Sequence, residues 1–131
     1  MKIAFFETKP WEKKILRKEL KKHHLKHKLL FFKEPLNDKN ARKAKDCEII
    51  SVFVYSKVDT ELKQLPRVKL ITTRSTGYDH IDLEECMRRK IAVCNVPVYA
   101  EHSVAEHTFA LLLAISRNIT KAYVRIHKDN F

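Results

Sequence analysis

The sequence predicts an α/β fold: a flavodoxin-like, doubly wound parallel sheet of five strands, followed by a long C-terminal helical extension. Apolar runs of strand length alternate with helical patterns, which is typical of β-α-β units on a parallel sheet. The 131 residues, 44% of them hydrophobic, suffice for one core and are too few for a second full domain. Five strands connected by helices favour the strand order 2-1-3-4-5.

The first two strands are predicted at residues 2–7 and 28–32, on either side of an amphipathic helix. That helix is expected to begin at Pro10, because the first helical turn tolerates proline. A short helix with a weak pattern is expected over residues 37–45. The apolar residues of the first helix recur at helical spacing between lysines: Trp11, Ile15, Leu16, Leu20 and Leu25.

The central strand is expected at residues 48–55, whose β-branched and aromatic side chains suit burial on both faces. Asp59 can cap a short helix that ends at Leu65, before Pro66. The fourth strand is predicted at residues 69–73.

The next predicted helix begins after Asp82, which has an acidic residue, Glu85, at the spacing of a capping box. It is expected to reach Lys90, and residues 91–95 are expected to form the fifth strand. These elements complete the five-stranded sheet.

A long helix is predicted to begin at Ser103, because Ser103 and Glu106 have the capping-box spacing ahead of an apolar run. It is expected to end near Asn118, and residues 119–131 are expected to form a helical stub. The apolar positions of this stub have no sheet left to cover, which indicates a partner outside the domain. We therefore expect a homodimer, with exchange of the C-terminal helix as one route.

Positive charge is concentrated in one segment. Residues 9–45 contain 14 lysines and arginines against 4 acidic residues, whereas residues 46–131 contain 12 against 11. The lysines surround an amphipathic helix, and no base-stacking aromatic pattern accompanies them, so a solvated face is favoured over specific nucleic-acid binding. A basic nucleic-acid-binding module nevertheless stays open as an alternative function.

Cysteine usage and hydropathy indicate a cytoplasmic protein without membrane contact. Cys47, Cys86 and Cys94 share no CxxC spacing and lie in apolar stretches, so reduced, buried thiols are expected. The beginning of the chain is charged too early for a signal peptide. The uncharged run at residues 108–116 is too short to span a bilayer.

The histidines are not expected to bind a metal or to act in catalysis. His23 and His27 are four residues apart on a helix but lack a third ligand. His80 and His102 are expected in loops, and His107 is expected on a helix without an acidic partner at a spacing typical of a catalytic triad.

The loops at the carboxyl ends of the strands are the expected binding site, as in other open α/β sheets. Two of them offer backbone amides near a turn, residues 55–57 and residues 75–77. The second contains Gly77, which can take a positive φ. Amides presented in this way suit a carboxylate or a phosphate.

Two segments carry a family resemblance. Arg74 is followed by Gly-Tyr-Asp-His-Ile-Asp, and Asn-Val-Pro-Val-Tyr, which begins at Asn95, is followed by Val-Ala-Glu-His from Val104. With these motifs the chain resembles the D-isomer-specific 2-hydroxyacid dehydrogenases, and among them most resembles the NAD-dependent D-lactate dehydrogenases. The resemblance extends weakly over the whole chain.

The resemblance implies a two-domain oxidoreductase that transfers a hydride between NAD and a small D-2-hydroxy acid such as D-lactate. Residues 1–100 would be its flavodoxin-like substrate-side domain. Residues 101–131 would be a helical linker toward an NAD-binding Rossmann domain.

The resemblance also implies roles for individual residues. The backbone amides of Tyr55 and Ser56 would bind the substrate carboxylate, and Gly77 would shape the adjoining turn. Tyr99 would line the pocket close to substrate and nicotinamide. Val104 would face the cofactor.

The catalytic Arg, Glu and His of such enzymes, and the glycine-rich turn that binds the pyrophosphate, would follow Phe131. The single glycine of the chain cannot form such a turn. We therefore expect weak binding of a 2-keto or 2-hydroxy acid, no cofactor on this chain alone, and no turnover. The alternative is a self-standing flavodoxin-like interaction module, either a natural relative or an engineered domain, without catalysis.

Overall fold

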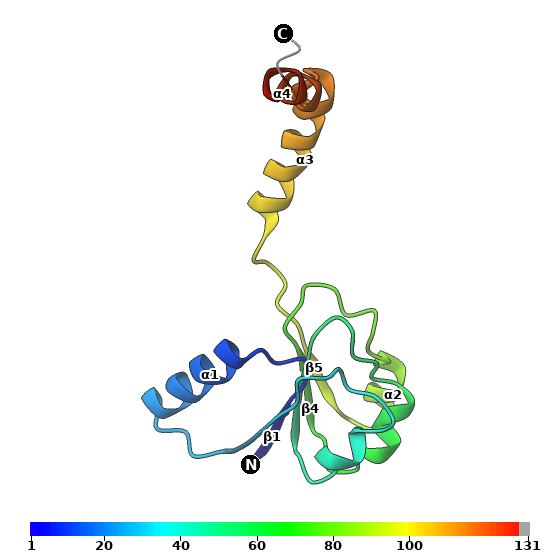
Figure 1. The fold of residues 1–131 in the computed structure, drawn as a ribbon. Helices are drawn as coiled ribbons and strands as arrows, with labels where there is room; N and C mark the ends of the chain where they lie inside the picture. The colour runs from blue at the N-terminus through cyan, green and yellow to red at the C-terminus, as the bar shows by residue number, and fades with distance from the viewer. Residues whose placement is uncertain (129–131) are drawn as a thin grey trace. The chain divides into compact units, whose positions relative to one another are not determined.

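The structure is a computed structural model that describes residues 1–128 (Figure 1). The chain divides into two compact units, Met1–Pro97 and Val98–Phe131. The first unit contains the whole sheet, and the second contains two helices. The final three residues, 129–131, to which the predicted C-terminal stub extends, lie outside the described part.

All four strand pairings in the sheet are parallel, and the strand order is β2-β1-β3-β4-β5. This confirms the predicted fold class and order. The strands are β1 (Lys2–Phe5), β2 (Lys28–Phe31), β3 (Ile49–Val52), β4 (Leu70–Thr73) and β5 (Ala92–Cys94).

One face of the sheet carries the hydrophobic core. Ala4, Ile50 and Ile71 are neighbours in the sheet register, and each is fully buried. Side chains from three short helices complete this cluster, so these helices cover the same face. The helices are η1 (Ala41–Ala44), η2 (Thr60–Gln64) and α2 (Leu83–Arg88). The first two are 3₁₀ helices, in the places where short helices were predicted.

Helix α1 (Pro10–Lys22) lies on the opposite face. There the ring of Phe31 stacks on that of Phe5, and the charged ends of Lys13 and Arg17 lie over it. No residue of α1 is fully buried, and Trp11 of the predicted apolar stripe is 59% exposed. Leu16 and Leu20 are half-buried, and long cationic side chains also cover apolar surface with their stems while their charges stay in water.

The cap predicted at Asp82 is present: its carboxylate accepts a hydrogen bond from the amide of Glu85 at 2.9 Å. The reciprocal half of the predicted capping box is absent. The Glu85 side chain instead forms two hydrogen bonds with Arg88, and the Asp82 amide donates to the carbonyl of Val58.

The second unit consists of α3 (Glu101–Ser116) and α4 (Ile119–His127). The prediction that the long helix begins at Ser103 is wrong, because α3 starts two residues earlier and the residue before it is Ala100. A side-chain cap stabilises a helix by only about 1 kcal/mol, which is too little to fix its start. Asn118 separates the two helices with a φ of 51°, a conformation that asparagine tolerates well.

The three cysteines are free thiols, and Cys47 and Cys86 are buried as predicted. Burial raises the pKa of both thiols, which makes them poor nucleophiles. The prediction was wrong for Cys94, which is exposed because it ends β5, an edge strand. Within residues 1–128, no helix is both long enough and apolar enough to cross a membrane.

Candidate functional site

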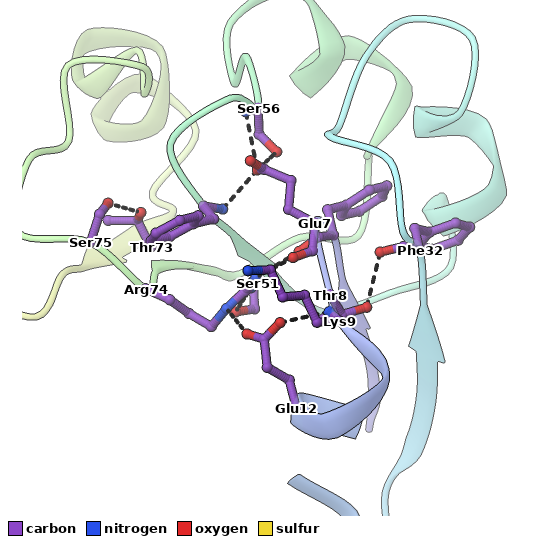
Figure 2. A network of polar contacts seen from close by, with 12 residues as sticks. Glu7, Thr8, Lys9, Glu12, Phe32, Ser51, Ser56, Thr73, Arg74 and Ser75 are labelled. Carbon is purple, nitrogen blue, oxygen red and sulfur yellow. Dashed lines mark hydrogen bonds and ion pairs between the residues drawn. The ribbon is translucent and has the colours of Figure 1, made fainter. Parts of the chain in front are cut away.

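The carboxyl ends of β1, β3 and β4 lie side by side, because these strands are parallel neighbours in the sheet. Three loops leave the sheet at this edge: residues 6–9, residues 53–59 and residues 74–82. Their backbone amides and polar side chains form the candidate site, all of it within the first unit (Figure 2).

Arg74 connects these loops. Its guanidinium donates hydrogen bonds to the carbonyl oxygens of Phe6 (2.8 Å) and Glu7 (3.2 Å) and to the hydroxyl of Ser51 (3.1 Å). It also forms an ion pair with Glu12 at 3.4 Å (Figure 2). Burial lowers the pKa of Arg74, while the charges of Glu12 and Glu7 oppose this effect. Because its donors are occupied by protein acceptors, Arg74 holds the site together rather than binding a ligand.

Glu12 has a second role at the beginning of α1. Its carboxylate accepts a hydrogen bond from the amide of Lys9 at 2.6 Å, which caps the helix. The ion pair with Arg74 therefore ties the start of α1 to the end of β4.

A chain of hydroxyl groups fixes the conformation of the 74–82 loop. The Thr73 hydroxyl lies 2.5 Å from that of Ser75 and 3.2 Å from Nε2 of His80. The Ser75 hydroxyl donates to the carbonyl oxygen of Gly77 at 2.7 Å. The amide side chain of Asn95 donates to the carbonyl of Thr76 at 2.8 Å, which anchors the turn to the end of β5.

The turn at Thr76 and Gly77 presents amides that the protein does not use. Neither backbone N–H donates a hydrogen bond to any acceptor in residues 1–128. Such paired free donors at a fixed turn suit a carboxylate. Gly77 can take a positive φ but does not do so in this turn. A Cβ atom added at Gly77 would meet only Oδ2 of Asp79, at 3.5 Å.

The amides of Tyr55 and Ser56, in contrast, already have an acceptor. Both donate to the carboxylate of Glu7, at 2.8 Å and 3.1 Å. A substrate carboxylate could reach these two amides only by displacing Glu7. Ser56 is almost fully buried, whereas the side chain of Tyr55 is 79% exposed.

A cavity of about 530 Å³ lies between the 53–59 loop and the 74–82 loop. Three carboxylates line it, and its lining residues include one ammonium group, that of Lys57. This balance of charge does not favour a carboxylate ligand inside the cavity. The acidic lining residues are Asp59, Asp79 and Asp82.

Two predicted site residues, Tyr99 and Val104, belong to the second unit, and both are exposed. The proximity of Tyr99 to Tyr55 and Gly77 stays a prediction, as does the role of Val104 in facing the cofactor. Across residues 1–128, no cluster of three or more His, Cys, Asp or Glu side chains could hold a metal ion.

The fold and the site define a class of protein: a flavodoxin-like α/β domain with free backbone amides at the carboxyl ends of its central strands. Residues 3–129 match the family model described as D-isomer specific 2-hydroxyacid dehydrogenase, catalytic domain. The chain therefore belongs to the D-isomer-specific 2-hydroxyacid dehydrogenase family, as its motifs indicated.

The relatives are consistent with this assignment. The chain is 39% identical to 2-hydroxyacid dehydrogenase homolog 1 of Schizosaccharomyces pombe and 33% identical to D-lactate dehydrogenase of Escherichia coli; each alignment covers 100% of this chain and 40% of the relative. The solved structure of D-lactate dehydrogenase from Aquifex aeolicus, complexed with NAD and lactic acid, is 35% identical with a TM-score of 0.87. That match covers 98% of this chain and 38% of the other. The chain thus spans about 40% of the length of the curated relatives that it matches.

Proposed function

We propose that this chain forms the substrate-side wall of an oxidoreductase that transfers a hydride between NAD and a small D-2-hydroxy acid such as D-lactate. The family assignment supports the reaction class. D-lactate is favoured because D-lactate dehydrogenases stand among both the sequence relatives and the structural neighbours.

The substrate carboxylate is assigned to the turn at Thr76 and Gly77. The observation that carries this assignment is the pair of amides that donate to no acceptor within residues 1–128. Tyr55 contributes its exposed side chain to the same edge. The buried Ser56 anchors the loop, because its amide donates a hydrogen bond to Glu7. Tyr99 would line the pocket close to substrate and nicotinamide. The amides at this edge would bind the carboxylate of the acid, and the side chains would orient it.

NAD supplies the hydride acceptor or donor when it is bound. The only glycine in the chain is Gly77, so this chain offers no glycine-rich turn for a pyrophosphate. Of the residues present, Val104 is the one proposed to face the cofactor. The catalytic Arg, Glu and His and the rest of the NAD site would come from a Rossmann domain after residues 101–131, the proposed linker.

A self-standing interaction module and a nucleic-acid-binding module are less well supported. The match to a catalytic domain runs over residues 3–129, including the neutral part of the chain. We further propose a cytoplasmic location and a homodimer, with exchange of the C-terminal helix as one route. The dimer is supported by the exposed apolar side chains of α3 and α4.

The proposal is tested by mixing the purified 131-residue chain with pyruvate and NADH and following the absorbance of NADH. We expect no turnover, because the proposal assigns the groups that bind the pyrophosphate and transfer protons to the Rossmann domain. A sustained rate proportional to the concentration of this chain would contradict the proposal that the catalytic residues belong to another domain.

A further inference from the structure

The carboxylate of Glu7 binds a set of hydrogen-bond donors in residues 53–56, which we call the 53–56 loop. It accepts hydrogen bonds from the amides of Phe53 (2.9 Å), Tyr55 (2.8 Å) and Ser56 (3.1 Å), and it also accepts one from the Ser56 hydroxyl. Figure 2 shows the side chain pointing from the end of β1 toward this loop. Hydrogen bonds to a charged acceptor are roughly twice as strong as neutral ones.

The backbone of Glu7 is held in an unfavourable conformation while it makes these contacts. Its φ is 55°, in the left-handed region, which costs a residue other than glycine on the order of 1 kcal/mol. Two backbone contacts fix this conformation: its amide donates to the carbonyl of Glu34 at 3.1 Å, and its carbonyl accepts from Arg74. Surrounding contacts therefore outweigh the local strain and direct the side chain at the loop.

The 53–56 loop has few other attachments. Within residues 1–128, the amides of Phe53, Tyr55 and Ser56 donate to Glu7 and to no backbone carbonyl. Two other contacts hold the loop: the Ser56 hydroxyl accepts a hydrogen bond from the amide of Leu36 at 2.9 Å, and the guanidinium of Arg74 lies 5.8 Å from the ring centroid of Phe53. The position of the exposed Tyr55 side chain thus depends on one carboxylate that lies 48 residues away in sequence.

We propose that Glu7 is a positioning residue for substrate binding: its carboxylate fills the donor set of the 53–56 loop and thereby holds Tyr55 toward the substrate. This inference rests on the proposed function. It also explains how one edge of the sheet can present two sets of amides while only one accepts the substrate. An internal carboxylate saturates the set at residues 53–56 and leaves the amides of Thr76 and Gly77 free.

The first test measures amide hydrogen exchange in the 131-residue chain for the wild type, Glu7→Ala and Glu7→Gln. In Glu7→Ala, the amides of Phe53, Tyr55 and Ser56 should exchange about tenfold faster or more, while Ile50 in β3 is unchanged. Glu7→Gln retains one acceptor oxygen, so its exchange rates should lie between those of the wild type and Glu7→Ala. Glu34→Gln, an exposed acid with the same loss of charge, should match the wild type.

Acetate provides a chemical rescue, because the emptied donor set suits a free carboxylate. Adding acetate to Glu7→Ala should restore slow exchange at the same three amides and should leave the wild type unaffected. Unchanged exchange in Glu7→Ala, or an equal acceleration throughout the sheet, would overturn the proposal. If Glu7→Ala does not fold, the isosteric Glu7→Gln decides by the same criterion.

The second test separates this inference from the proposed function by adding pyruvate to the wild type and Glu7→Ala. Pyruvate should shift the NMR signal of the Gly77 amide in both proteins but should shift the ring signals of Tyr55 only in the wild type. Equal responses of Tyr55 in both would overturn the role of Glu7. A Gly77 amide that responds in neither would contradict the proposed function, while the exchange result for Glu7 would stand.

Discussion

Arg74 joins three elements through one side chain, so its replacement should lower the stability of the fold. Replacement by methionine leaves the carbonyls of Phe6 and Glu7 and the carboxylate of Glu12 without their partner. Breaking a largely buried ion pair in this way should lower the free energy of unfolding by roughly 3 kcal/mol in urea titrations. Arg74→Lys keeps the charge but not the planar array of N–H donors, so its free energy of unfolding should lie between those of the wild type and the methionine variant. A methionine variant as stable as the wild type would refute this role.

Gly77 is expected to tolerate alanine in the folded state. Its φ is not positive, and a Cβ would make only ordinary contact with Asp79. Gly77→Ala should therefore change the free energy of unfolding by less than about 1 kcal/mol. If the turn must approach a substrate closely, the same variant should weaken pyruvate binding measured by NMR. A large loss of stability would show that the turn needs glycine for its backbone instead.

Glu61 should make stability depend on pH. Its side chain is almost fully buried, and this burial raises its pKa above the ordinary value of 4.5. A raised pKa means that folding favours the protonated form, so this stabilisation is complete below pH 4.5 and is lost as pH rises through the folded-state pKa. Glu61→Gln should therefore raise the melting temperature at pH 7, with a difference that shrinks toward pH 4. The exposed Glu106→Gln serves as control, and a constant difference at all pH values would contradict the account.

At this scale the sequence predicted residues better when they belonged to a local motif. Arg74, Gly77 and Asp82 stand in recognisable patterns, and the structure shows a hydrogen bond at each. Glu7 was missed, because its partners are 46 to 49 residues away and no local spacing reveals them. For the same reason, the sequence did not show that the amides of Tyr55 and Ser56 already donate to Glu7.

Among the elements, the two capping motifs had different outcomes. Asp82 caps α2, whereas Ser103 lies inside the first turn of α3. Asp82→Ala should therefore lower the free energy of unfolding by about 1 kcal/mol, and Ser103→Ala should change it by much less. The pair is measured by urea titration under identical conditions. Equal losses in both variants would show that the assigned start of α3 is wrong.

Strand positions were predicted to within a few residues because parallel, buried strands have continuous apolar runs. The burial of α1 could not be predicted in the same way. Its hydrophobic periodicity gave the helix, but the sequence does not say how closely a helix approaches its sheet, and Trp11 and Ile15 remain exposed.

For the whole molecule, the apolar surface of the second unit should govern association. Leu112, Ile115 and Tyr123 are each more than half exposed on α3 and α4. If this surface pairs with that of a second copy, sedimentation of the 131-residue chain should show a dimer whose population rises with concentration. Charged substitutions at Leu112 and Ile115 should return it to a monomer, and Trp11→Lys in the first unit should not. A monomer at high concentration would argue against the dimer.

The central claim is that the carboxyl ends of β3 and β4 form a wall for a small 2-keto or 2-hydroxy acid. It is tested most directly by titrating the isotope-labelled chain with pyruvate and recording amide NMR shifts, with acetone as a control that lacks the carboxylate. We expect saturable shifts centred on Thr76 and Gly77 that acetone does not produce. Shifts confined to the lysines of α1, or the same response to acetone, would contradict it.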